Sequence, residues 1–304
     1  ILRKCFRGSC KPNQRITKMI IPETLEKHDH VVLGNALYFT DLSNQIYHNG
    51  PGVSSSTIRR FGVSQLHALN EEIEDTPALR FGSAAHSLIV EGESQFVKDV
   101  ACLVGSPYTN ANKDLRAEYT QRGLTVITNT EKETIYNMKN SLIPEADKLL
   151  HPSENEYPDC FNYPYERALY WEENGLLCKV KADVIRFPVS QPHDSKTIDI
   201  IDYKTTQSVE PKSFLNSVKK YQYDLQAAWY KKAFEQAGFN VNNFLFVAQE
   251  KKPPYATKIF KMKKNDLEAG WLELDRLINE YKHVVGGKSL PSTYNTPDLV
   301  EIEL

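Results

Sequence analysis

The sequence of 304 residues lacks the features of membrane proteins and of secreted, disulfide-bonded proteins. It has no run of about 18 apolar residues, so a membrane span is not expected. The five cysteines are scattered without a Cys-x-x-Cys pair, which gives little support for a zinc or iron–sulfur site. An odd number of cysteines without such spacing is typical of reduced thiols. We therefore expect a soluble, cytoplasmic protein that has no membrane partner.

A strong excess of one charge is also missing. The formal net charge of -2 argues against a protein that coats nucleic acid non-specifically, although a local basic groove remains compatible with it. The Gly-x-x-x-x-Gly-Lys phosphate loop, the Rossmann glycine fingerprint and the Gly-x-Ser-x-Gly elbow are all absent. These absences give no support to the nucleotide-binding and α/β-hydrolase schemes that depend on such motifs.

Residues 1–19 contain several basic residues and no acidic one, without the apolar core of a signal peptide. We expect a disordered leader that precedes a natural start at Met19, with a nucleic-acid-binding arm as the alternative. Residues 20–49 have a weak pattern and are expected to be rich in loops. At residues 54–57, serines and a threonine offer helix N-caps, and phosphate binding is the alternative use of the same groups.

Alternating side chains predict a β region in the middle of the chain. Residues 167–172 and 176–187 read as two strands joined by an Asn174-Gly175 turn, and residues 197–204 form a third strand. In that third strand Asp202 and Lys204 share one face, and Asp183 joins them if the last two strands pair. Two carboxylates and a lysine at one sheet edge suit a divalent metal and an activated water. Surface salt bridges are the alternative.

Apolar spacing predicts helices around this region. The first, over residues 78–91, carries small residues that allow close packing on a sheet. It also carries His86, which is either a hydrogen-bonded core residue or a ligand. The other predicted elements are a loop with a short helix at 107–123, a helix at 130–150 that Pro144 kinks or ends, one long helix at 211–238, strands at 240–249 and 256–262, and a closing helix with an Asn265/Glu268 capping box. This order predicts a single α/β domain around a mixed sheet.

Six segments match a known superfamily in order and spacing: YHNGPGVS (47–54), GSAAH (82–86), YWE (170–172), GLLCKVKAD (175–183), DYKTT (202–206) and YQYDLQAAWY (221–230). Through them the chain resembles the PD-(D/E)xK nucleases and, within these, the RecE-type exodeoxyribonuclease VIII family of phages and prophages. The resemblance implies a restriction-endonuclease-like fold, with a central mixed β-sheet flanked by helices. It also implies a single exonuclease domain at residues 44–304, after a leader and poorly defined segment at 1–43.

The resemblance implies a Mg²⁺-dependent enzyme, with Mn²⁺ as a substitute. By position, His86, Asp183 and Asp202 would be metal ligands, together with the carbonyl group of Tyr203. Lys204 would be the catalytic lysine.

Further residues carry over by position. Glu166 resembles the family's extra acidic catalytic residue. Gln226 and Tyr230 would line the site and contact DNA, and Ser54 and Ser56 are candidates for the 5′-phosphate end.

The implied activity is 5′→3′ degradation of linear double-stranded DNA, which leaves 3′ single-stranded tails for recombination. A ring-shaped homo-oligomer, with a tetramer expected, and a RecT-like single-strand annealing partner are also implied. Ala182 replaces the family's usual proline before Asp183, a change that affects strand shape rather than chemistry. The alternatives are a PD-(D/E)xK endonuclease, a CRISPR-associated iron–sulfur nuclease, for which the cysteines do not fit, and a non-catalytic DNA-binding module.

Overall fold

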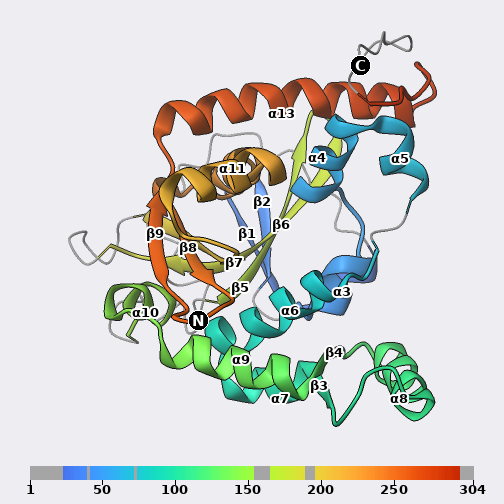
Figure 1. The fold of residues 1–304 in the computed structure, drawn as a ribbon. Coiled ribbons are helices and arrows are strands. Elements are labelled where there is room, and N and C mark those ends of the chain that lie inside the picture. The colour runs from blue at the N-terminus through green and yellow to red at the C-terminus, as the bar shows by residue number, and fades with distance from the viewer. Residues whose placement is uncertain (1–22, 40–41, 72–73, 154–164, 189–195, 295–304) are drawn as a thin grey trace, which may run out of the picture.

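The computed structural model describes residues 23–39, 42–71, 74–153, 165–188 and 196–294 (Figure 1). Seven strands form one sheet: β1 (His30–Leu33), β2 (Ala36–Phe39), β5 (Tyr165–Glu173), β6 (Leu176–Arg186), β7 (Thr197–Thr206), β8 (Asn240–Glu250) and β9 (Thr257–Lys261). Their spatial order is the chain order. Only β7 and β8 pair in parallel, and the other neighbours are antiparallel. The predicted mixed sheet is thereby confirmed.

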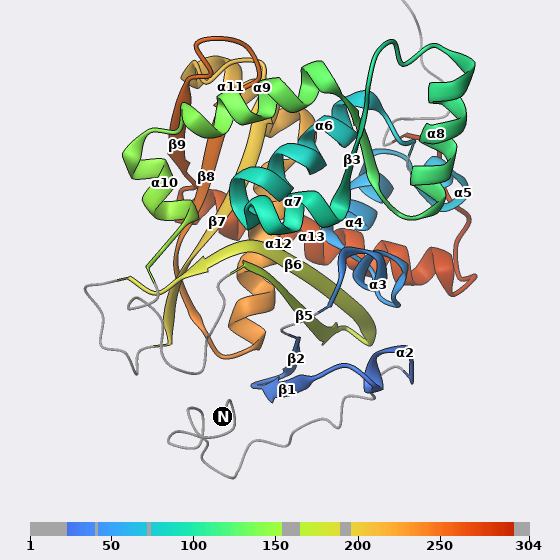
Figure 2. The same ribbon diagram turned by 90° about the horizontal axis from the view of Figure 1, so that it is seen from below.

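Helices cover both faces of this sheet (Figures 1 and 2). One face is covered by α4 (Ser55–Val63), α11 (Pro211–Tyr221), α12 (Tyr223–Gln236) and α13 (Lys264–Val285), and the other by α6 (Pro77–His86), α9 (Asn129–Asn140) and α10 (Pro144–Leu150). The alternation of β7 explains this layering, because successive side chains of a strand point to opposite faces. Ile198 and Ile200 enter the core beneath α12, whereas Ile201 and Tyr203 enter the core beneath α6.

Shorter elements complete the described region. They are α2 (Glu23–Glu26), α3 (Asn44–Asn49), α5 (Gln65–Asn70), the π-helix η1 (Ser87–Glu91), α7 (Glu93–Asp99) and α8 (Asn110–Gln121). Two further strands, β3 (Val100–Leu103) and β4 (Thr125–Thr128), form a separate parallel pair, which the sequence patterns did not predict. In the part of the chain that the structure describes, no helix is both long and apolar enough to cross a membrane.

The hairpin between β5 and β6 has the predicted turn. Asn174 and Gly175 have φ values of 51° and 75°, as a type I′ turn requires of its two central residues. Hydrogen bonding between β6 and β7 runs from Arg186 to Val184 and then stops. Continuing the same register by one pair places Asp183 opposite Asp202, so the two carboxylates lie where the strands begin to separate.

Three local predictions are wrong or need revision. Residues 30–33 and 36–39 are strands rather than loops, because β2 pairs with β5 and β1 pairs with β2 at the sheet edge. The single helix expected at 211–238 is two helices, since Gln222 adopts the left-handed conformation at φ 51° and ψ 48°. The closing helix begins after Lys263, which makes no side-chain cap, so the predicted capping box is absent. The helix expected at 130–150 is divided near Pro144: α9 already ends at Asn140, and Pro144 is the first residue of α10.

The expectations for residues 1–19 lie outside the described residues.

Candidate active site

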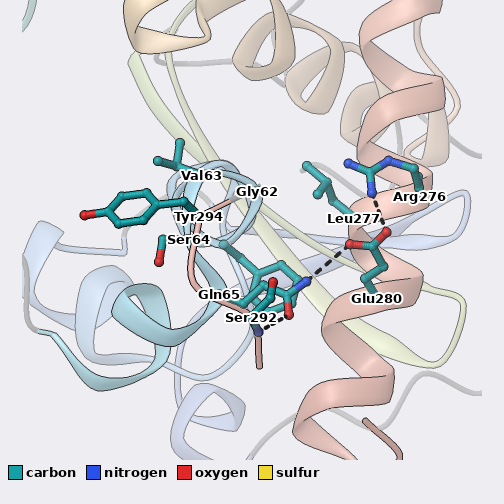
Figure 3. Close-up of a pocket in the computed structure, with 10 residues that line it drawn as sticks. Gly62, Val63, Ser64, Gln65, Arg276, Leu277, Glu280, Ser292 and Tyr294 are labelled. Atoms are coloured by element: carbon teal, nitrogen blue, oxygen red, sulfur yellow. Dashed lines mark hydrogen bonds and ion pairs between the residues drawn. The ribbon is translucent and has the colours of Figure 1, made fainter. Parts of the chain in front are cut away.

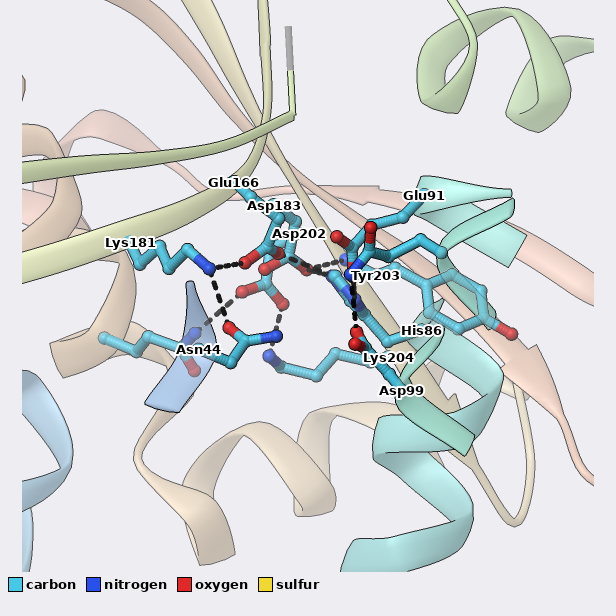
Figure 4. Close-up of polar contacts among 12 residues, drawn as sticks. Asn44, His86, Glu91, Asp99, Glu166, Lys181, Asp183, Asp202, Tyr203 and Lys204 are labelled. Carbon is cyan, nitrogen blue, oxygen red and sulfur yellow. Dashed lines mark hydrogen bonds and ion pairs between the residues drawn. The ribbon is translucent and has the colours of Figure 1, made fainter. Parts of the chain in front are cut away.

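Three side chains from separate elements converge at one edge of the sheet (Figure 4). Nε2 of His86, at the end of α6, lies 3.4 Å from Oε1 of Glu166 on β5 and 3.4 Å from Oδ2 of Asp183 on β6. One potential ligand atom from each residue lies within 4.8 Å of the other two. His86, which sequence alone left between a core and a ligand role, thus faces a pair of carboxylates.

Glu166 is held in this cluster by an unusual backbone and by a lysine. Its φ of 53° lies in the left-handed region, which costs a non-glycine residue about 1–3 kcal/mol and is common at functional sites. Lys181 places Nζ 2.6 Å from Oε2 of Glu166 and donates a second hydrogen bond to Oδ1 of Asn44 at 2.7 Å. The carboxylate of Glu166 is therefore fixed from two sides.

Asp202 lies beside the cluster and is 1% exposed. Its Oδ1 accepts a hydrogen bond from Nε2 of Gln226 at 2.7 Å, and its Oδ2 contacts the ammonium group of Lys204. Burial raises the pKa of Asp202 to about 6, against the opposing effect of the Lys204 charge. Burial lowers the pKa of Lys204, but the nearby carboxylates of Asp202 and Asp183 outweigh burial and raise it. Lys204 therefore stays charged.

The backbone of Tyr203, which follows Asp202 in β7, hydrogen-bonds to the carboxylate of Asp183. Its N–H donates to Oδ2 of Asp183 at 2.9 Å, whereas its hydroxyl points to the opposite face and donates to Oε1 of Gln249. Asp202 and Lys204 therefore lie on one face of β7 and the Tyr203 side chain on the other, as predicted. Because the N–H and C=O of a strand residue project to the same side, the Tyr203 carbonyl also projects towards β6.

Opposite charges in the cluster shift each other's pKa values. Burial raises the pKa of Asp183, but the positive charges of His86 and Lys204 outweigh burial and lower it. Burial lowers the pKa of His86, but the charge of Asp183 and hydrogen bonding to it, with the hydrogen-bonding contact of Glu91 and the charge of Glu166, raise it well above its usual value. Each ionised group thus depends on an oppositely charged neighbour.

A cavity of about 520 Å³ opens beside these residues. Asp183 and Glu166 line it. All four residues expected to contact DNA line it as well: Ser54, Ser56, Gln226 and Tyr230. The cationic lining consists of Arg59, Lys179 and Lys181, so carboxylate and cationic side chains line the same cavity.

Of the two predicted serines in this cavity, one caps a helix. Ser54 is the N-cap of α4, where its Oγ accepts from the N–H of Thr57, so the capping interpretation is confirmed. Oγ of Ser56 lies 2.8 Å from Oγ of Ser54 and has no such role in the helix. Ser54 therefore caps the helix, whereas the half-buried hydroxyl of Ser56 contacts the Ser54 hydroxyl without capping.

A second hollow lies between α4, α5 and α13 (Figure 3). Its volume is only about 10 Å³, and hydrogen bonds from Gln65 to Glu280 and from Ser292 to Gln65 cross it. It is too small for a substrate and holds no cluster of potential ligands.

Several residues of the site were not predicted. Arg59 donates from its guanidinium group to the carbonyls of Tyr221 and Gln222, and it thereby holds the junction of α11 and α12. Lys179 donates to the carbonyls of Tyr47 and Gly50, each at 2.7 Å. A lysine among apolar residues of a strand was the available sequence signal for Lys179, whereas nothing local marked Arg59.

The comparison with protein families matches residues 54–300 to a family described as a PDDEXK-like domain of unknown function (DUF3799). The match covers most of the chain, including every residue of the cluster. The chain belongs to this PDDEXK-like family. Membership supports nuclease activity on DNA, and PDDEXK nucleases generally depend on a divalent metal.

One solved structure supports the fold of this PDDEXK-like domain. A protein from Eubacterium rectale described as a "Putative exonuclease" aligns with a TM-score of 0.59 and 17% identity, over 87% of this chain and 96% of the other. A phage-related exonuclease from Haemophilus somnus 129PT aligns at 14% identity over 81% of this chain and 100% of the other, with a TM-score of 0.27. No curated protein sequence matches significantly.

The side chains of this PDDEXK-like domain fit a divalent metal. His86, Glu166 and Asp183 offer one imidazole nitrogen and two carboxylates at ligand spacing, a donor set that suits Mg²⁺ or Mn²⁺. Nε2 of His86 is buried and makes no hydrogen bond with any described residue, although it faces both carboxylates. A buried nitrogen that faces two carboxylates at this spacing suits a metal ligand.

Proposed function

We propose that this protein is a Mg²⁺-dependent exonuclease that degrades linear double-stranded DNA 5′→3′ and leaves 3′ single-stranded tails for recombination. One observation carries the proposal. Glu166 and Asp183, which form a cluster with His86, line a cavity together with hydroxyl and cationic side chains, and Gln226 in the same lining binds Asp202 of the Asp202–Lys204 pair. Phosphate groups of DNA suit such a lining, because cationic side chains and hydroxyls are the usual protein partners of phosphate oxygens.

His86, Asp183 and Asp202 would hold the metal, with Glu166 and the Tyr203 carbonyl as further donors. A bound Mg²⁺ would supply an activated water and would neutralise charge on the phosphodiester. Lys204 remains protonated and places a positive charge where negative charge develops on the phosphate.

The remaining residues position these groups and the DNA. Gln226 fixes the orientation of the Asp202 carboxylate, and Lys181 fixes that of Glu166. Ser54, Ser56 and Tyr230 line the cavity that would receive the 5′ end of the DNA.

The proposal includes an assembly and a setting. A homo-oligomeric ring, with a tetramer expected, would enclose linear double-stranded DNA, and a RecT-like annealing protein would act on the 3′ tails in the cytoplasm. The nuclease domain would include β1 and β2 in addition to residues 44–304, because both strands hydrogen-bond into the same sheet as the site.

The decisive experiment uses a linear duplex with a 5′-phosphate, labelled separately at each end, beside a closed circle of the same sequence. Digestion is followed with Mg²⁺ and with EDTA, for the wild type and for Asp202→Ala and Lys204→Ala. Progressive loss of the 5′-ended strand, absent with EDTA, in both variants and on the circle, is expected.

Other outcomes would replace the proposal. Cutting of the closed circle would indicate an endonuclease. Metal-independent binding without cleavage of any DNA would indicate a non-catalytic module. Loss of the 3′-ended strand would overturn the polarity alone. Sedimentation of the same preparation tests the ring, since a monomer at working concentration would contradict it.

A further inference from the structure

The second ring nitrogen of His86 faces a carboxylate that none of the sequence motifs identified. Nδ1 of His86 lies 3.4 Å from Oε1 of Glu91, while Nε2 faces Glu166 and Asp183 (Figure 4). The Glu91 side chain is only 9% exposed. The imidazole ring is thus held between one carboxylate on its far side and two on the side of the cluster.

The local helix geometry explains how Glu91 reaches this position. In an α-helix the neighbours on one face are three or four residues apart, so residues i and i+5 do not face each other. Directly after His86, however, the chain forms the π-helix η1, whose wider turn has i→i+5 hydrogen bonds. This wider turn places Glu91 next to His86.

The π-helix is anchored on both sides. Leu88, Ile89 and Val90 are at most 1% exposed and fix the turn in the core beneath the sheet. Gly92, with a φ of 93°, ends the turn immediately after Glu91. A π-helical turn inside a helix is rare and is frequent at functional sites.

We propose that Glu91 is a positioning residue that receives the Nδ1–H of His86 and thereby directs Nε2 towards the metal. Metal-binding histidines almost always donate their other N–H to such a partner, which fixes the ring and increases its basicity as a ligand. The inference rests on the proposed role of His86 as a metal ligand. In this proposal the π-helix brings Glu91 within hydrogen-bonding reach of His86.

Mn²⁺ binding tests the inference without reference to nuclease activity. The dissociation constant is measured by electron paramagnetic resonance of free Mn²⁺, for the wild type, Glu91→Ala, Glu91→Gln and His86→Ala. We expect Glu91→Ala to weaken binding about 10–100-fold, as loss of an outer partner usually does. Glu91→Gln keeps an oxygen acceptor for Nδ1–H and should restore most of the affinity.

Glu93→Gln is the matched control. It removes a negative charge two residues further along, where Glu93 contacts Tyr136 instead of His86. Mn²⁺ affinity should remain at the wild-type value. If Glu93→Gln weakened binding as much as Glu91→Ala, general charge rather than the contact would be responsible, and the inference would be wrong.

Histidine-selective ¹⁵N NMR of the Zn²⁺-loaded protein provides the structural readout. In the wild type we expect the metal at Nε2 and the proton at Nδ1 of His86, and in Glu91→Ala a broadened or mixed pattern. Unchanged affinity and an unchanged pattern in Glu91→Ala, with weakened binding in His86→Ala, would overturn this inference alone. Unchanged affinity in His86→Ala would instead remove His86 from the proposed metal site, and the inference would be overturned with that assignment.

Discussion

Gln226 donates a hydrogen bond from Nε2 to Oδ1 of Asp202 at 2.7 Å, although one residue lies on a helix and the other on the central strand β7. Both side chains are buried, at 6% and 1% exposure. A buried carboxylate oxygen depends on such a donor, because an unpaired one would carry the full cost of its lost hydration. The helix α12 therefore contributes directly to the orientation of a candidate metal ligand.

Replacement of Gln226 by Leu should reduce both stability and catalysis. The free energy of unfolding should fall by about 1.5–3 kcal/mol, the usual contribution of a hydrogen bond to a charged group. The cleavage rate should fall about 10–100-fold, as for other partners of metal ligands. Urea unfolding and single-turnover cleavage measure the two effects. Gln236→Leu on the same helix, where Gln236 contacts Glu173 away from the site, should leave cleavage unchanged.

Metal affinity should rise with pH. The carboxylates around His86 raise its pKa well above 6.5, so a proton occupies the ring at neutral pH and must leave before a metal binds. Displacement of one proton gives at most about a tenfold gain in affinity per pH unit, up to the pKa. Mn²⁺ titrations at several pH values measure the slope. An unaltered slope in His86→Ala would show that another group is displaced.

Ser54 and Ser56 should respond differently to substitution by alanine. Ser54→Ala removes the N-cap of α4 and should lower the free energy of unfolding by about 1 kcal/mol. Ser56→Ala removes no cap and should leave stability near that of the wild type. If both hydroxyls bind the DNA end, both variants should show a smaller rate ratio between 5′-phosphorylated and 5′-hydroxyl duplexes. An unchanged ratio in both would limit these serines to a structural role.

Glu210 should stabilise the protein in a pH-dependent way. Its carboxylate caps α11 by accepting from the N–H groups of Lys212 and Ser213, and these bonds lower its pKa below the usual 4.5. The stabilisation is therefore present above the unfolded-state pKa and is lost as the pH falls through the folded-state value. Thermal unfolding should show Glu210→Ala to be less stable than the wild type at pH 7, with the difference shrinking at acidic pH. A constant difference would contradict the assignment.

The alternation of side chains was enough to predict the strands that carry Asp183, Asp202 and Lys204, and the Asn-Gly turn before them. These features are local, because period-two patterning and turn chemistry need only neighbouring residues. The roles of these residues, in contrast, stay proposals.

Features set by distant contacts could not be predicted in the same way. The strand β2 is defined by its pairing with β5, where Ala36 lies opposite Trp171, and no local pattern encodes that partner. Gln222 breaks a helix without being glycine or proline, and Arg59 from α4 binds the carbonyls at the break. The contact of Glu91 with His86 requires a π-helix, whose spacing differs from the α-helical repeat that sequence patterns assume.

All ten residues of β7 pair with β8, in the interior of the seven-stranded sheet. Most enzymes carry reactive groups on loops, which open locally at little cost, whereas opening of a central strand requires nearly the whole free energy of unfolding. Asp202 and Lys204 are therefore displaced from the site only when the domain as a whole unfolds. A destabilising substitution in the distant core should reduce the number of active molecules, while each molecule that remains folded keeps its full turnover rate.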